Sequence, residues 1–130
     1  MNTVATMPTL LIADDNAGVR RVLVHMLASI GMRAVAVADG LQALESARQF
    51  LPDLIILDVR MPGRGGYEVC AELRRDETTR RIPVLMLTGL GEHEAEYEGI
   101  GSGADGYLGK PFEFNELELR VRGLLARAAS

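Results

Sequence analysis

Five residues whose side chains could bind a metal or take part in a reaction stand at or just after the ends of short apolar runs. They are Asp14, Asp15, Asp58, Thr88 and Lys110. Three carboxylates make an oxygen-rich site that suits Mg²⁺, and a carboxylate can also act as a nucleophile toward a phosphoryl group. A hydroxyl and an ammonium nearby can hydrogen-bond and neutralise the oxygens of that group. The pattern therefore indicates magnesium-dependent phosphoryl chemistry at an aspartate.

Lys110 is the only lysine among the 14 basic residues of the chain. An ammonium is a compact point charge on a flexible stem, whereas a guanidinium is planar and tends to pair bidentately with carboxylates. Carboxylates that share one crevice repel, by about 4 kcal/mol for two unit charges about 4 Å apart at an effective dielectric of about 20. We therefore interpret Lys110 as the cation that offsets this repulsion.

Other catalytic chemistries lack their residues in this sequence. There is no Ser–His pair, no base beside the single cysteine, Cys70, and no Walker-type glycine loop. Residues 89–91 begin like a dinucleotide-binding fingerprint, but Glu94 stands where the third glycine belongs. His25 and His93 are interpreted as solvated, because the first lies off an apolar helix face and the second lies in an acidic stretch.

The apolar runs predict buried strands. They cover residues 9–13, 33–38, 54–57, 82–88 and 106–108. Short, almost continuous apolar runs are typical of strands that are covered on both faces of a parallel sheet. Because parallel strands end at the same edge of a sheet, the five polar residues are expected to share one rim.

Helical patterns alternate with these runs. The residues predicted to face the core are Val19, Val22, Leu23, Met26, Leu27 and Ile30 in the first helix, Leu44, Ala47 and Leu51 in the second, Val69, Cys70 and Leu73 in the third, and Phe114, Leu117, Val121, Leu124, Leu125 and Ala128 in the last. A polar helix is predicted over 91–102, and the charged stretch 74–81 is interpreted as a solvated helix end and loop. Five strands alternating with five helices predict an α/β fold, a doubly wound parallel sheet in a three-layer sandwich.

Length and charge limit the function further. A chain of 130 residues with 48% hydrophobic content fits one domain with a single packed core. The net charge of −4, without a basic patch, argues against direct binding of nucleic acid or a membrane surface. Neither a signal peptide nor a transmembrane stretch is recognisable. We expect a cytoplasmic protein in which Cys70 is a buried, reduced side chain.

Four segments together, LLIADDN, LDVRMPG, LMLTG and GADGYLGKPF, resemble the receiver domain of bacterial two-component response regulators, including the chemotaxis regulators. The resemblance extends from about Leu10 to Ala128. It implies a flavodoxin-like fold with strand order 2-1-3-4-5. The expected domain organisation is a lead-in over 1–8, a receiver domain over 9–128, and a tail or the start of a linker at 129–130.

The resemblance also implies roles for individual residues. Asp58 would be the phosphoacceptor, and Asp15, Asp58 and the backbone carbonyl of Arg60 would bind Mg²⁺ directly, with Asp14 acting through a water molecule. Thr88 and Lys110 would bind the phosphoryl group. Thr88 and Tyr107 would form the switch that follows phosphorylation. Lys110–Pro111 is expected to be a cis peptide. Arg60 and Leu90 occupy variable positions that flank the phosphorylation site.

The implied partners are a sensor histidine kinase or a histidine phosphotransfer protein, an output domain or target protein, and a second copy of the chain on phosphorylation. The predicted kinase-docking surface consists of Ala17, Arg20, Arg21, Val24, Pro111 and Phe112. The switching surface is expected on the fourth helix, fifth strand and fifth helix. Gly65 stands where an acidic residue is common in the family, which should affect only the start of the third helix.

Two alternatives use similar residues. A haloacid-dehalogenase-like phosphatase also needs a nucleophilic aspartate, Mg²⁺ and a lysine, but its Asp-x-Asp motif fails at Asp58 and at Asp14. A flavodoxin-like FMN binder would carry a Ser/Thr/Gly phosphate loop after the first strand, where Asp14, Asp15 and Asn16 stand. Stoichiometric uptake of a phosphoryl group would distinguish a receiver from a phosphatase, and a colourless protein would exclude the flavin binder.

Overall fold

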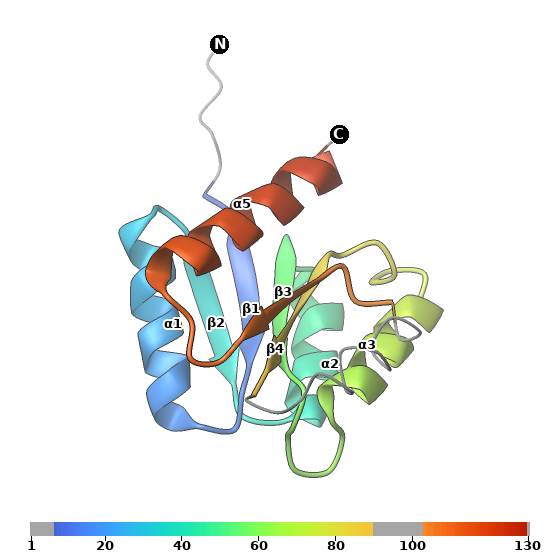
Figure 1. Cartoon of the computed structure of the whole chain (residues 1–130). Helices are drawn as coiled ribbons and strands as arrows, with labels where there is room; N and C mark the ends of the chain where they lie inside the picture. The colour runs from blue at the N-terminus through green and yellow to red at the C-terminus, as the bar shows by residue number, and fades with distance from the viewer. Residues whose placement is uncertain (1–6, 90–102, 130) are drawn as a thin grey trace.

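The computed structural model shows a five-stranded parallel sheet between two layers of helices (Figure 1). It describes residues 7–89 and 103–129. The strands are β1 (Thr9–Ala13), β2 (Arg33–Val37), β3 (Leu54–Asp58), β4 (Val84–Thr88) and β5 (Gly106–Gly109). Their order in the sheet is β2-β1-β3-β4-β5, and every neighbouring pair is parallel. The predicted sheet and strand order are therefore confirmed.

Within the described residues the sheet is covered by four helices, not the five predicted. They are α1 (Ala17–Ser29), α2 (Gly40–Phe50), α3 (Gly66–Arg75) and α5 (Phe114–Ala129). Helices α1 and α5 cover one face of the sheet and α2 and α3 cover the other (Figure 1). The helix predicted over 91–102 lies outside the described residues.

Alternation along the strands divides the core into two clusters. Leu11, Ile55 and Met86 face α2 and α3, whereas Leu10 and Ile56 face α1 and α5. Successive side chains of a strand point to opposite faces, so a run with no polar residue is buried on both sides. All five residues of β3 are buried, as the apolar run predicted. Cys70 is also buried, again as predicted.

Side-chain caps determine where the helices begin. The side chain of Asn16 accepts a hydrogen bond from the Val19 N–H (3.0 Å) at the start of α1. Asp39 accepts one from the Gln42 N–H (2.9 Å) at the start of α2. Each cap satisfies a donor that the first helical turn leaves without a partner. Gly31, at φ +80°, follows the C-cap of α1 in the left-handed conformation that favours glycine.

Several predicted orientations are wrong. Val22 is 47% exposed and Leu51 is 51% exposed, and Ala128 is also exposed. Val24, predicted as part of the docking surface, is half-buried and packs against the cluster beneath α1 and α5. The buried stripe of α1 is narrow and centred on Leu23 and Leu27, which turns Val22 away from the sheet. Leu51 is the left-handed C-cap of α2, so it has already left the helical face.

Candidate phosphoacceptor and metal site

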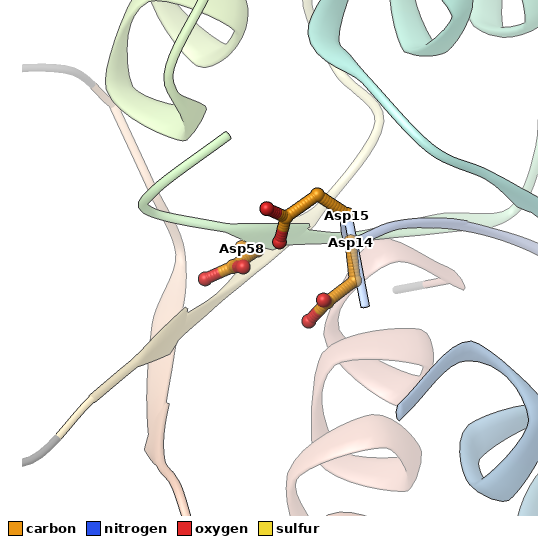
Figure 2. A group of neighbouring side chains, drawn as sticks. All are labelled: Asp14, Asp15 and Asp58. Atoms are coloured by element: carbon orange, nitrogen blue, oxygen red, sulfur yellow. The ribbon is translucent and has the colours of Figure 1, made fainter. Parts of the chain in front are cut away.

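The register of the central strands brings the predicted carboxylates together. Ala13 on β1 pairs with Leu57 on β3, so the next residues along, Asp14 and Asp58, leave the sheet side by side. Figure 2 shows the side chains of Asp14, Asp15 and Asp58 gathered where β1 and β3 end. One oxygen from each carboxylate lies within 4.8 Å of the others. Asp14 is 0% exposed and Asp58 is 6% exposed, whereas Asp15 is exposed.

Lys110 lies between the two buried carboxylates. Its Nζ is 2.9 Å from Asp14 Oδ2 and 3.3 Å from Asp58 Oδ2. The backbone carries the side chain there, because the Lys110 N–H donates to the Thr88 carbonyl (2.6 Å) just beyond the pairing of Thr88 with Gly109. The Lys110–Pro111 peptide is cis, as predicted. We call Asp14, Asp15, Asp58 and Lys110 the carboxylate cluster.

The electrostatics of the cluster make Asp58 hard to ionise. Burial raises the pKa of Asp58, and the charge of Asp14 raises it further, against the opposing effects of Lys110 and the Arg60 N–H. Burial alone would lower the pKa of Lys110, but the hydrogen bonds and charges of Asp14 and Asp58 more than offset this, so its pKa is raised. The lysine therefore stays charged, while the carboxylates lack full compensation.

The backbone of Asp14 is anchored by groups that the sequence did not reveal. Its N–H donates to the Val37 carbonyl (3.2 Å), and its Oδ1 accepts from the Asn16 N–H (2.9 Å). Its carbonyl accepts from Arg20 Nη1 (2.8 Å). Arg20, predicted only as a docking residue, thus contacts the site directly. The sequence did carry one signal for this contact. Arg20 is a cation in the first turn of a helix that has no acidic residue there, which is unfavourable unless the cation finds an acceptor nearby.

The loop after Asp58 is held against the site by Gly66, a second residue that the sequence did not single out. The Gly66 N–H donates to the Val59 carbonyl (2.9 Å). A Cβ at position 66 would collide with the Asp58 carbonyl oxygen and would lie 2.8 Å from Met86 Sδ. Only glycine allows the start of α3 to approach this closely. The Arg60 N–H also points to Asp58 Oδ1, at 3.4 Å.

Thr88 and Tyr107 lie on the two strands beyond Asp58. Thr88, the last residue of β4, is 4% exposed. Tyr107 is half-buried on β5, pairs with Met86 rather than with Thr88, and packs against the core cluster beneath α2 and α3. The structure thus brings Thr88 to the same rim as the carboxylates. Tyr107 lies level with Met86, two residues before Thr88 along the strand direction.

A groove of about 600 Å³ opens beside the carboxylate cluster, between α1 and the segment after β5. It is lined by Asn16, Gly18, Val19, Val22, Met26, Lys110, Pro111 and Phe112. Of the predicted docking residues, only Pro111 and Phe112 line it. Ala17 and Arg21 are exposed on α1, whereas Arg20 is half-buried. Leu90, the second variable position, lies outside the described residues.

The carboxylate cluster fits a divalent cation. Its donors are oxygens from three carboxylates, one of them exposed to incoming water, and hard oxygen donors are what Mg²⁺ prefers. The excess of negative charge over the single ammonium is the electrostatic condition that a bound cation would relieve. The residues present are therefore suited to Mg²⁺.

Comparison with known proteins identifies the family. The sequence profile of the response regulator receiver domain matches residues 10–122. The chain is 45% identical, over 93% of its length, to the DNA-binding dual master transcriptional regulator RpaA of Synechocystis, and 39% identical, over 91%, to the DNA-binding response regulator MtrA of Mycolicibacterium paratuberculosis. It spans 50% and 51% of those two proteins, about half of each.

Solved structures agree with the profile. A putative response regulator from Chloroflexus aurantiacus superposes with a TM-score of 0.90 at 40% identity, covering 93% of this chain and 99% of that one. The receiver domain of the sensor histidine kinase PA1611 from Pseudomonas aeruginosa, crystallised with a magnesium ion in its active-site cleft, gives 0.86 at 34% identity over 93% and 99% of the two chains.

Nothing in the comparisons supports the haloacid-dehalogenase-like phosphatase. Among the described helices, none has the length and apolar character needed to cross a membrane. The strand order, the rim carboxylates and the sequence matches all lead to one assignment. The chain belongs to the family of response regulator receiver domains.

Proposed function

We propose that Asp58 accepts a phosphoryl group from a phosphohistidine of a sensor histidine kinase or a histidine phosphotransfer protein, in a reaction that depends on Mg²⁺. The observation that carries this proposal is the position of Asp58. It ends a fully buried strand, is almost completely enclosed, and has Lys110 at 3.3 Å and two further carboxylates beside it. A buried carboxylate with an adjacent ammonium can attack a phosphoryl group whose charge that ammonium neutralises.

The residues have separate tasks in this step. An oxygen of Asp58 forms the new P–O bond while the P–N bond of the phosphohistidine breaks and the imidazole leaves with its electron pair. Lys110 and the Thr88 hydroxyl hold two phosphoryl oxygens. We propose that Asp15, Asp58 and the Arg60 carbonyl hold Mg²⁺ directly and Asp14 through water. When bound, the ion neutralises charge on the transferred group.

Acetyl phosphate provides the test, because it needs no protein partner. With Mg²⁺ present, the wild-type protein should gain the mass of one phosphoryl group, and Asp58→Asn should gain none while keeping the wild-type circular dichroism spectrum. Asp53→Asn, at the other end of β3, is the matched control and should label normally. Labelling of Asp58→Asn at the wild-type level would refute the proposal. Many turnovers per protein would instead indicate a phosphatase.

We propose that the groove between α1 and the segment after β5 receives a helix of the phosphodonor protein. Val22 is exposed at 47% and lines the groove with Val19, Met26 and Phe112. Ala17 and Arg21 flank it on the exposed side of α1. An amphipathic helix places apolar side chains into such a groove, and this would bring its phosphohistidine to the rim. The docking surface thus keeps Pro111 and Phe112 but replaces Val24 by Val22.

The docking proposal predicts that Val22→Glu lowers phosphoryl transfer from a phosphorylated histidine phosphotransfer protein by about tenfold or more, as a charge in an apolar hot spot does. Phosphorylation by acetyl phosphate needs no protein partner, so its rate reports on the carboxylate cluster alone. That rate should be unchanged in Val22→Glu. Leu119→Glu, at a leucine of α5 that is 73% exposed and does not line the groove, is the control for added charge. Unchanged protein-to-protein transfer in Val22→Glu would show that partners bind elsewhere.

We further propose that phosphorylation shifts Thr88 and Tyr107 and thereby the surface formed by β5, α5 and the segment before them. This shift would control an output domain or a separate target protein, with pairing of two phosphorylated copies as one response. The named relatives are DNA-binding regulators about twice as long as this chain, which supports control of transcription. We assign the receiver domain to residues 9–128, acting in the cytoplasm as a signalling domain whose only chemistry is its own phosphorylation and dephosphorylation.

A further inference from the structure

Arg20 makes a contact that its position on α1 does not explain. It lies in the first turn of the helix, where its own N–H donates to the Asn16 carbonyl (3.0 Å). Its side chain turns back past the helix start, and Nη1 donates to the carbonyl of Asp14 at 2.8 Å. The residue is half-buried, whereas its neighbour Arg21 is exposed. A docking residue would be expected to extend away from the protein.

The position of Arg20 at the start of α1 is electrostatically unfavourable, which indicates a functional role. A helix start carries a partial positive charge, so a cation in the first turn is unfavourable. The first turn of α1 contains no acidic residue that would offset it. Natural sequences break local rules of this kind mostly at functional sites. Here the guanidinium gains a charge-assisted hydrogen bond to the strand end that carries the carboxylates.

Because Arg20 donates to the Asp14 carbonyl, it acts on one particular part of Asp14. The backbone N–H of Asp14 is bonded to Val37, and its side chain to Asn16 and Lys110. Those three contacts fix Asp14 itself. The Asp14 carbonyl belongs to the peptide group that continues into Asp15, and this group is planar. By holding the carbonyl, Arg20 therefore sets the direction in which exposed Asp15 leaves the strand.

We propose that Arg20 is a positioning residue for the metal-binding carboxylates, and that it acts through the Asp14–Asp15 peptide. This inference rests on the proposed function, in which Asp15 binds Mg²⁺. It moves Arg20 from the docking surface to the support of the metal site. Residues that orient metal ligands without touching the metal commonly change metal affinity by 10–100-fold when they are replaced.

A magnesium titration followed by amide spectra tests the inference without any phosphorylation. Arg20→Met keeps the length of the side chain but has no donor, and it should bind Mg²⁺ about tenfold more weakly than wild type. Arg20→Lys keeps a charged donor and should recover most of the affinity. Arg33→Met removes an equal charge at the opposite end of the sheet and should titrate like wild type.

The sign of the effect separates positioning from simple electrostatics. Removing a positive charge near a cation site would by itself strengthen Mg²⁺ binding, so weaker binding by Arg20→Met supports positioning. Equal or stronger binding overturns it. The ¹⁵N shift of Asp15 gives a second measurement, since the Asp14 carbonyl and the Asp15 nitrogen share one peptide group. That shift should change in metal-free Arg20→Met, or in Arg20→Ala if Arg20→Met fails to fold, and should stay closer to wild type in Arg20→Lys. An unchanged shift in the variant that lacks the donor would also overturn the inference.

Asp15→Asn distinguishes the inference from the proposal beneath it. If Asp15→Asn and Arg20→Met both weaken Mg²⁺ binding, both statements are supported. If only Asp15→Asn weakens it, the metal site is correct and the role of Arg20 is wrong. If Asp15→Asn binds Mg²⁺ like wild type, the proposed metal ligands themselves are wrong.

Discussion

Two charged clusters lie at opposite ends of β4, and they differ in their balance of charge. At the carboxyl end, the carboxylate cluster sets three acids against one ammonium. At the amino end, Arg74 of α3 binds Asp105 (2.7 Å) and also donates to the backbone carbonyls of Arg80, Ile82 and Gly103 at 2.8–3.0 Å. We call Arg74, Asp105 and these three carbonyls the arginine cluster.

The difference lies in whether the charges are satisfied. In the arginine cluster one guanidinium finds acceptors in several directions, and Asp105 also accepts the first N–H of β4, from Val84 (2.8 Å). In the carboxylate cluster the pKa of Asp58 is raised, mainly because burial penalises its charge. The first arrangement stabilises the junction of α3, β4 and β5. The second stores unfavourable energy that a cation or a phosphoryl group can relieve.

Loss of the arginine cluster should have the largest effect on stability. Arg74→Met should lower the free energy of unfolding by about 2–3 kcal/mol, because it leaves Asp105 without its cation and several carbonyls without their donor. The value is moderated because the two side chains are 22% and 33% exposed. Urea denaturation measures it. Arg122→Met, which breaks the exposed ion pair with Glu118, should cost less than about 0.5 kcal/mol, and an equal loss in both variants would remove the contrast.

Replacement of the acid in the arginine cluster should cost less. Asp105→Asn keeps an oxygen for the Val84 N–H but removes the charge that faces Arg74. We expect a loss of about 1 kcal/mol in unfolding free energy, which thermal unfolding would detect. An Asp105→Asn protein as stable as wild type would mean that the ion pair adds nothing beyond its hydrogen bonds.

The same substitution in the carboxylate cluster should have the opposite sign and the smallest size. A raised folded-state pKa means that Asp58 contributes fully to stability below its unfolded value of 3.8 and less as the pH rises through the folded pKa. In metal-free buffer, Asp58→Asn should therefore unfold at a temperature a few degrees above wild type near pH 7, with little difference near pH 3. Lys110 keeps Asp14 as its partner. A lower unfolding temperature near pH 7 would show that the carboxylate cluster is not strained.

These contrasts show why one cluster could be predicted and the other could not. The carboxylate cluster follows from strand ends, because Asp14, Asp58 and Thr88 each close an apolar run and parallel strands share one rim. The arginine cluster joins Arg74 to Asp105, 31 positions away, and to backbone carbonyls up to 29 positions away, and carbonyl contacts leave no mark in the sequence. The interpretation of 74–81 as solvated was accordingly wrong for Arg74 and for Thr79, whose hydroxyl is buried and bonded to the Leu73 carbonyl (2.8 Å).

The directions of the side chains on α1 were also poorly predicted from the sequence. Val19, Val22, Leu23 and Met26 all fit a helical apolar pattern, but the width of the buried stripe depends on how α1 meets the sheet. Arg20 and Arg21 are adjacent and identical in type, so only the fold shows that one turns back to Asp14. Residue type and period predicted the site, whereas the supporting contacts required the structure.

The assignment of Asp58 as the phosphoacceptor can be tested by locating the phosphorylated residue. After reaction with acetyl phosphate and Mg²⁺, reduction of the acyl phosphate with borohydride marks the modified aspartate, and peptide mass spectrometry identifies it. We predict a single mark at Asp58 that is absent when Mg²⁺ is chelated. A mark at Asp14 or Asp15, or equal labelling without Mg²⁺, would show that Asp58 is not a magnesium-dependent phosphoacceptor.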